Sequence, residues 1–289
     1  MALTKVIGNG LGAVTQDGAA TFNEGSADVD FRVESNGNAN MINVDGGNDR
    51  VGLGIAPSFN VQIDKSSTNT TLTDLTDAQL VLSNTGSATT NQHVKLGFRF
   101  QDGSVNGQSM IAAVRESGSS RASSLRFYTG PASDGDPEEA VSINSTGAVS
   151  MPLQPAFSAK ATNDQTNIAV NSNVTLVLDS ERFDQNADFA SNTFTAPVTG
   201  KYQLQTVVYF QNLDSASTVY NVKITTSNTD YQAPFDPDFG QDNGYWGWGF
   251  SILADMDAND TAYVFVRQTG GTQQTDLANA SYFSGYLVC

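Results

Sequence analysis

The sequence predicts an all-β chain made of several consecutive folding units. Three observations support this fold class. Apolar and polar residues alternate with a period of two in short runs, which is typical of half-buried strands. Asn-Gly and Gly-Gly pairs, which favour hairpin turns, separate these runs. No segment has the periodicity of an amphipathic helix.

Residues 1–60 are predicted to form short strands of a fibre-like or anchoring segment. The alternating runs are Phe31 with Val33, Ile42 with Val44, and Val51 with Leu53 and Ile55. A two-stranded hairpin with so few apolar side chains is marginal in water, so another surface must cover it. An identical neighbour is the simplest cover, because symmetry repeats each apolar row around an axis.

Residues 61–150 are predicted to form a middle β-domain, followed by a linker at 151–155 that contains Pro152 and Pro155. A polar stretch comes first and includes His93, for which an exposed loop position is expected. The predicted strands are Val94–Phe100, Met110–Arg115, Leu125–Tyr128 and Ala140–Ile143. Positions 94, 96, 98 and 100 share one face of their strand, because strand side chains alternate.

Residues 156–289 are predicted to form an antiparallel jelly-roll sandwich. Only 7 of the 27 aromatic residues precede residue 151, and 20 follow it, so this part can build its own core. In the segment from Phe194 to Tyr202, Pro197 and Gly200 predict a strand, a turn and a second strand, with Gly200 supplying a conformation closed to other residues. The last strand, with Phe283, Tyr286 and Val288, is expected near the centre of the sandwich.

Charge and composition exclude several functions. The net charge is −16 and no basic run occurs, so a nucleic-acid partner is not expected. The single Cys and single His do not suffice for a disulfide, a transition-metal site or a Ser-His hydrolase within one chain. No stretch approaches the roughly 18 apolar residues of a membrane-spanning helix, so membrane insertion is not expected. We expect no catalytic residue, and a protein that is not an enzyme.

The run Gly244–Phe250 is the most distinctive local feature. Trp246, Trp248 and Phe250 fall on one face of a strand, and Tyr245 adjoins them. Such a row of rings suits stacking on sugars, which makes Tyr245, Trp246 and Trp248 the candidate binding residues. The alternative is that the rings fill the sandwich or a trimer axis.

Asp236, Asp238 and Asp242 form the candidate metal site. Oxygen-rich loops of this kind can bind Ca²⁺, which takes about six to eight oxygen ligands. The spacing matches no known calcium loop, and solvated turn aspartates are the alternative. No other cofactor is expected.

The segment Asp30–Asn38, with Met41–Asp45 and Asp49–Ser58, resembles a recurrent motif of bacteriophage tail-fibre and related structural proteins. Ile143–Val149 and the opening Met-Ala-Leu-Thr-Lys-Val resemble the same class. This resemblance implies a homotrimer located in the virion, with the N-terminal region contacting other virion proteins.

The C-terminal part resembles the globular head of complement component q, a tumour necrosis factor-like jelly roll. The matching blocks are Pro155–Ala159, Phe183–Asn186, Phe194–Tyr202 and Tyr282–Val288. Residues 227–249 depart from the family. This resemblance also implies trimerisation about a three-fold axis.

Together these features predict a trimeric phage fibre, made in the host cytoplasm, whose distal head binds a host cell-surface glycan or protein. One alternative is a capsid decoration protein or head fibre with a stabilising or loosely adhesive role. A secreted adhesin and a polysaccharide depolymerase with paired carboxylates are further alternatives.

Overall fold

The computed structural model describes residues 30–65, 67, 75, 78–102, 105–131 and 135–289. All secondary structure in these segments is β-strand, which confirms the predicted all-β fold class. The chain divides into a first unit, Met1–Ser83, and a second unit, Asn84–Cys289. The opening motif Met-Ala-Leu-Thr-Lys-Val lies outside the described residues.

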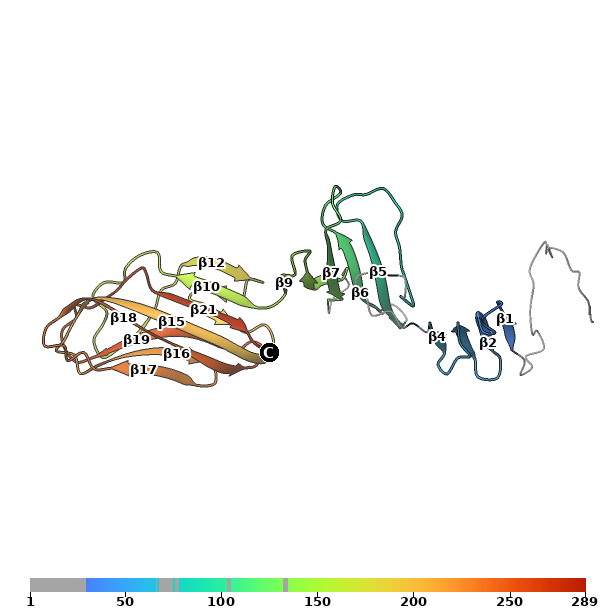
Figure 1. Cartoon of the computed structure of the whole chain (residues 1–289). Coiled ribbons are helices and arrows are strands. Elements are labelled where there is room, and N and C mark those ends of the chain that lie inside the picture. The colour runs from blue at the N-terminus through green and yellow to red at the C-terminus, as the bar shows by residue number, and fades with distance from the viewer. Residues whose placement is uncertain (1–29, 66, 68–74, 76–77, 103–104, 132–134) are drawn as a thin grey trace, which may run out of the picture. The chain divides into compact units, whose positions relative to one another are not determined.

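The first unit contains a four-stranded sheet in the order β1-β2-β3-β4 (Figure 1). Its strands are β1 (Phe31–Val33), β2 (Ile42–Asp45), β3 (Arg50–Leu53) and β4 (Val61–Ile63). β1, β2 and β3 are antiparallel neighbours, as the Gly-rich turns predict, whereas β4 runs parallel to β3. The sheet therefore extends past the predicted boundary at residue 60.

The second unit begins with a five-stranded antiparallel sheet in the order β5-β6-β7-β8-β9. Its strands are β5 (His93–Asp102), β6 (Val105–Arg115), β7 (Ser123–Thr129), β8 (Glu138–Ile143) and β9 (Val149–Ser150). The turn before β9 is stabilised by Asn144, whose Oδ1 accepts hydrogen bonds from the backbone N–H groups of Thr146 and Ala148. Gly147 has φ +84° there, a conformation that glycine adopts without strain.

The rest of the second unit is a sandwich of two antiparallel sheets (Figure 1). The first sheet has the order β12-β10-β21-β15-β18, and the second has β13-β14-β19-β16-β17. The first sheet consists of β10 (Ala156–Lys160), β12 (Ser180–Gln185), β15 (Gly200–Leu213), β18 (Asn243–Met256) and β21 (Tyr282–Leu287), with β20 (Asp276–Leu277) beside β15. The second consists of β13 (Phe189–Ala190), β14 (Thr193–Thr195), β16 (Val219–Thr226), β17 (Asp230–Phe235) and β19 (Thr261–Thr269), with β11 (Asn173–Thr175) beside β19. Between β10 and β21 the chain crosses repeatedly from one sheet to the other, as in a jelly roll.

The sandwich has its own aromatic core, as the aromatic distribution predicts. Phe157 is 1% exposed, and its ring centroid lies 4.6 Å from that of Phe194 and 5.0 Å from those of Phe189 and Phe283. The last strand, β21, lies between β10 and β15, so its predicted central position is confirmed. Tyr286 nevertheless points away from the core and is 53% exposed.

The role predicted for Gly200 needs a correction. Gly200 is not among the residues with positive φ. A Cβ atom at this position would instead lie 2.6 Å from both Leu287 Cδ1 and the Cys289 carbonyl oxygen. Glycine is required here because the chain after β21 passes against the start of β15, and not because of the turn conformation.

Candidate functional site

The sheet of the first unit has one apolar face that nothing in the described chain covers. The ladders align its side chains into the rows Phe31, Val44, Val51, Val61 and Val33, Ile42, Leu53, Ile63. All eight side chains are between 37% and 71% exposed. Asn43, on the opposite face, is only 4% exposed. The apolar face of this small sheet is therefore the one that faces water, the reverse of what a free monomer favours.

The sheet β5–β9 repeats this one-sided pattern. One of its rows consists of Val94, Ala113, Leu125, Ile143 and Val149, and the next includes Leu96 and Ile111. Leu125 is 42% exposed and Leu96 is 46% exposed. On the other face, Ala112 and Val114 are 3% and 5% exposed, although they lie beside polar neighbours.

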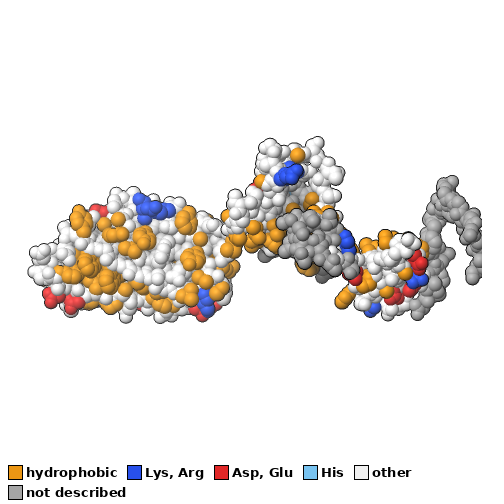
Figure 2. All heavy atoms as spheres, viewed as in Figure 1, with side chains coloured by type: hydrophobic (Ala, Val, Ile, Leu, Met, Phe, Trp, Pro, Cys, Tyr) orange, Lys and Arg blue, Asp and Glu red, His pale blue; other side chains and the backbone are white. Residues whose placement is uncertain are grey.

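The sandwich also has one apolar outer face, on its first sheet. The large hydrophobic side chains exposed on its strands are Phe183, Tyr209, Tyr245, Leu253 and Tyr286, and none of the described strands of the second sheet carries one. Tyr286 and Leu253 lie on either side of Gln203 in the ladder. Hydrophobic side chains reach the surface of both units in Figure 2. We call the three surfaces the apolar faces of the first sheet (β1–β4), the middle sheet (β5–β9) and the head (the sandwich sheet β12-β10-β21-β15-β18).

The three candidate binding residues on β18 do not share one face. Trp246 and Trp248 point inward and pack against the core, with ring centroids 6.3 Å and 5.2 Å from that of Phe235. Trp248 Nε1 donates a hydrogen bond to the Ala233 carbonyl at 2.9 Å. Tyr245 points outward and is 81% exposed. A stacking surface that contains all three rings is therefore absent, and Tyr245 is the one that a ligand can reach without rearrangement.

Two of the three candidate metal ligands, Asp242 and Asp236, accept hydrogen bonds through their carboxylates. Asp242 accepts hydrogen bonds from the Ser215 backbone and hydroxyl and from Gln274 Nε2. These bonds lower the pKa of Asp242. Asp236 Oδ1 accepts a hydrogen bond from the Asp238 backbone. Within the described segments, no group of three His, Cys, Asp or Glu residues is arranged to hold a metal ion.

A buried polar network holds together the loops at one end of the head. The Tyr220 hydroxyl lies 2.6 Å from Thr275 Oγ1, and Gln268 Nε2 donates to Ser217 Oγ at 2.9 Å. Asp214, only 3% exposed, accepts hydrogen bonds from the backbone of Ala216 and Thr272. Buried hydrogen bonds of this kind restrict loop conformation. They connect the loop between β15 and β16 to the loop after β19.

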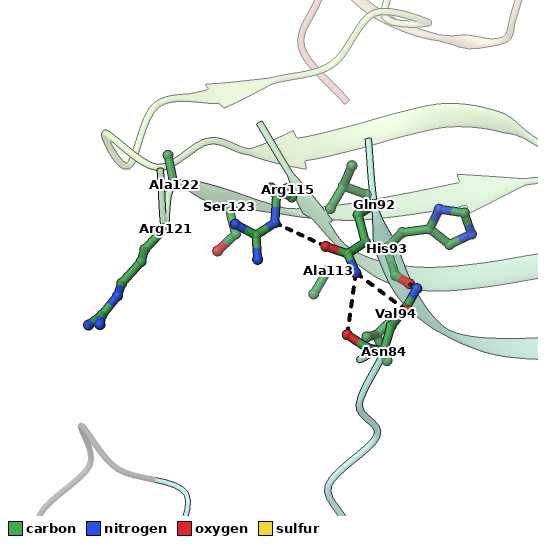
Figure 3. A pocket seen from close by; sticks show the side chains of 10 residues that line it. Asn84, Gln92, His93, Val94, Ala113, Arg115, Arg121, Ala122 and Ser123 are labelled. Atoms are coloured by element: carbon green, nitrogen blue, oxygen red, sulfur yellow. Dashed lines mark hydrogen bonds between the residues drawn. The ribbon is translucent and has the colours of Figure 1, made fainter. Parts of the chain in front are cut away.

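A separate polar pocket of about 160 Å³ lies in the middle sheet, at the ends of β5, β6 and β7. Figure 3 shows Arg115 near Gln92 and Ser123, while the Arg121 side chain extends away from them. Arg115 Nε donates to Gln92 Oε1 at 3.2 Å, and its Nη1 donates to the Ser120 carbonyl at 2.7 Å. His93, also on the wall, begins β5 and is exposed, so it is a strand residue and not the predicted loop residue.

A carboxyl group in the head gives the protein a predicted pH dependence. Burial, and then the nearby Asp184 carboxylate, raise the pKa of Asp188 to about 6. Its buried Oδ2 atom has no hydrogen-bond partner. A carboxyl pKa raised by folding means that the folded state prefers the protonated form. The associated stability is fully present below about pH 4, the unfolded pKa, and is lost as the pH rises through about 6.

We therefore expect Asp188→Asn to melt at a higher temperature than the wild type at neutral pH. The difference should shrink as the pH falls from about 6 to about 4, because the wild-type carboxyl becomes protonated. Melting curves across this range measure the effect. Asp236→Asn, at an exposed carboxylate, is the matched control, and an equal response of the two variants would contradict the prediction.

The topology and core define the second unit as an all-β module that ends in a jelly-roll head. Its structure is similar to the globular domain of zebrafish complement 1qA protein, with 16% identity over 47% of this chain and 98% of that chain and a TM-score of 0.36. It is also similar to murine APRIL at pH 8.0, with 8% identity over 47% and 99% of the chains and a TM-score of 0.36. No protein-family model and no curated protein sequence matches the chain.

Two features of these surfaces were missed by sequence reasoning. The first is the polar pocket, because Gln92 and Arg115 meet only through the pairing of β5 with β6. The second is the apolar face of the head, whose members come from four strands that are distant in sequence. The alternation around Leu253 and Tyr286 was the available signal, but it does not indicate which face is outward. No helix within the described residues is long and apolar enough to cross a membrane.

Proposed function

We propose that the chain is a homotrimeric, fibre-like structural protein of a bacteriophage particle, with a head that binds the host cell surface. The observation that carries the proposal is the succession of three one-sided apolar faces. They occur in the first sheet, the middle sheet and the head. Exposed apolar surface of this extent marks an interaction site.

Identical copies are the partner that suits all three faces. A different protein would need three apolar surfaces of its own, in the same order. A second copy of this chain has them already, because its sequence is identical. Association about a shared axis then turns each exposed row into part of a core. Three copies are proposed because the segments Asp30–Asn38 and Ile143–Val149 resemble phage fibre proteins.

Binding, and not catalysis, is the proposed activity of the head. The loops tied by Asp214, Tyr220 and Gln268 form a rigid end from which ligand contacts can be made. Three heads on one fibre convert weak single contacts into avidity through effective concentration. The N-terminal region would contact other virion proteins.

The oligomer is tested by light scattering on the full-length protein. We expect a mass about three times the 30.6 kDa of one chain. A mass equal to one chain at micromolar concentration would overturn the assembly. Labelling phage particles with antibody against the head tests the location, and label on the tail or the capsid separates tail fibre from capsid decoration. Unlabelled particles would contradict a virion role.

A further inference from the structure

We propose that the polar pocket of the middle sheet binds a small oxyanion, such as a carboxylate, phosphate or sulfate group. The pocket is formed by one chain, so the proposal stands independently of the assembly proposed above. Its volume of about 160 Å³ suits a single acidic group. Its lining combines the polar residues Asn84, Gln92, His93, Arg115, Arg121 and Ser123 with the apolar residues Val94, Ala113, Val114 and Ala122.

Arg115 is the central residue, because its guanidinium is already held in place. Two of its nitrogens donate to Gln92 Oε1 and to the Ser120 carbonyl. The remaining nitrogen, Nη2, has no partner within the described residues. Ser123 lies directly opposite Arg115 in the ladder between β6 and β7. A fixed guanidinium beside a hydroxyl matches the geometry by which proteins bind oxyanions.

Gln92 is itself fixed, which makes the position of Arg115 specific. Gln92 Nε2 donates to the Gly86 carbonyl at 3.0 Å and lies 3.4 Å from Asn84 Oδ1. The backbones of Gln92 and Arg115 are also hydrogen bonded at 2.8 Å. Little side-chain entropy therefore remains to be lost when an anion binds.

The charges around the pocket favour an anion over a neutral ligand. None of the residues that line it is acidic. Glu116, next in sequence to Arg115, accepts hydrogen bonds from the backbone and hydroxyl of Ser145, which lower its pKa. Arg126 is paired with Glu139 at 3.0 Å. Neither Arg115 nor Arg121 has a carboxylate partner in the part of the chain that the structure describes.

Two arginines without a carboxylate partner are unexpected in a protein with this many acidic residues. The chain has 14 Lys and Arg against 30 Asp and Glu, so an arginine has many carboxylates available. Two arginines without such a partner at one pocket leave a local positive charge on an acidic protein. Arg121 is exposed at the rim and can turn toward a bound anion (Figure 3).

The test is isothermal titration calorimetry of the full-length protein with sodium phosphate, sulfate, acetate and glucuronate at constant ionic strength. We expect saturable binding of at least one anion, with one site per chain. Arg115→Gln should weaken it by at least about tenfold, since hydrogen bonds to charged groups are lost. Tighter phosphate or sulfate binding would indicate a phosphorylated or sulfated ligand, and tighter glucuronate binding an acidic sugar.

Two further variants keep the test decisive. Arg121→Gln changes an exposed side chain, so it should weaken binding by a few fold without loss of folding. Arg182→Gln, at an exposed arginine of the head, should leave the affinity unchanged. The proposal is overturned if no anion binds saturably, or if both Arg115→Gln and Arg121→Gln bind as the wild type does.

Discussion

A variant with one aspartate on each apolar face is expected to behave as a 30.6 kDa monomer in light scattering. The substitutions are Val51→Asp, Leu125→Asp and Tyr286→Asp, which lie on the first sheet, the middle sheet and the head. Each carboxylate would be buried without a partner if copies pack on these faces, and the effective cost is several kcal/mol per ion. Three buried carboxylates together should cost more free energy than the association of the apolar faces provides.

The matched control places aspartates on the opposite faces of the same modules. Arg32→Asp, Lys95→Asp and Gln232→Asp together add more negative charge than the test variant. We expect the control to keep the wild-type mass, because these positions face away from the apolar rows. Loss of the oligomer in both variants would mean that total charge, and not the apolar faces, controls assembly.

Phe157→Ala is expected to destabilise the head by about 3–5 kcal/mol, the usual cost of removing a buried phenyl ring. Phe157 is 1% exposed and contacts the rings of Phe189, Phe194 and Phe283. Its removal therefore leaves a cavity between the two sheets. Urea unfolding followed by tryptophan fluorescence reports the head alone, because the two tryptophans of the chain, Trp246 and Trp248, both lie on β18.

Phe157→Leu provides the graded comparison for this experiment. Leucine keeps much of the volume of the ring, so the loss should be at most about half of that for alanine. An unfolding curve of Phe157→Ala that superimposes on the wild type would contradict the aromatic core of the sandwich.

The fold could be predicted from the sequence where local pattern and environment agree. The alternation of Val94, Leu96 and Phe98 defines a strand face, and the ladders place all three on one side of the middle sheet. Turn residues such as Asn144 and Gly147 also act locally, through a side-chain hydrogen bond and a positive φ angle within the turn itself. The aromatic excess after residue 150 predicted the aromatic core that the head contains.

The features that the local sequence pattern could not decide depend on how the strands pack in the folded chain. Gly200 suggested a special turn, but its constraint comes from Leu287 and Cys289. Trp246, Trp248 and Phe250 have the spacing of one strand face, and this face packs against the core, which was the alternative to a binding surface. Tyr245, at the adjacent strand position, points to the opposite face.

The central position of β21 has a consequence for how the head is made. In the folded head β10 pairs with β12 and β15 pairs with β18, but β21, between the two pairs, is translated last of these strands. The sandwich sheet β12-β10-β21-β15-β18 therefore cannot be continuous until β21 leaves the ribosome and joins the two halves. Closure through such distant pairings is slow, because the intervening loop entropy must be lost first. Newly made heads would thus expose Phe157 and its aromatic neighbours for a time, and this interval is when neighbouring nascent chains can misassemble.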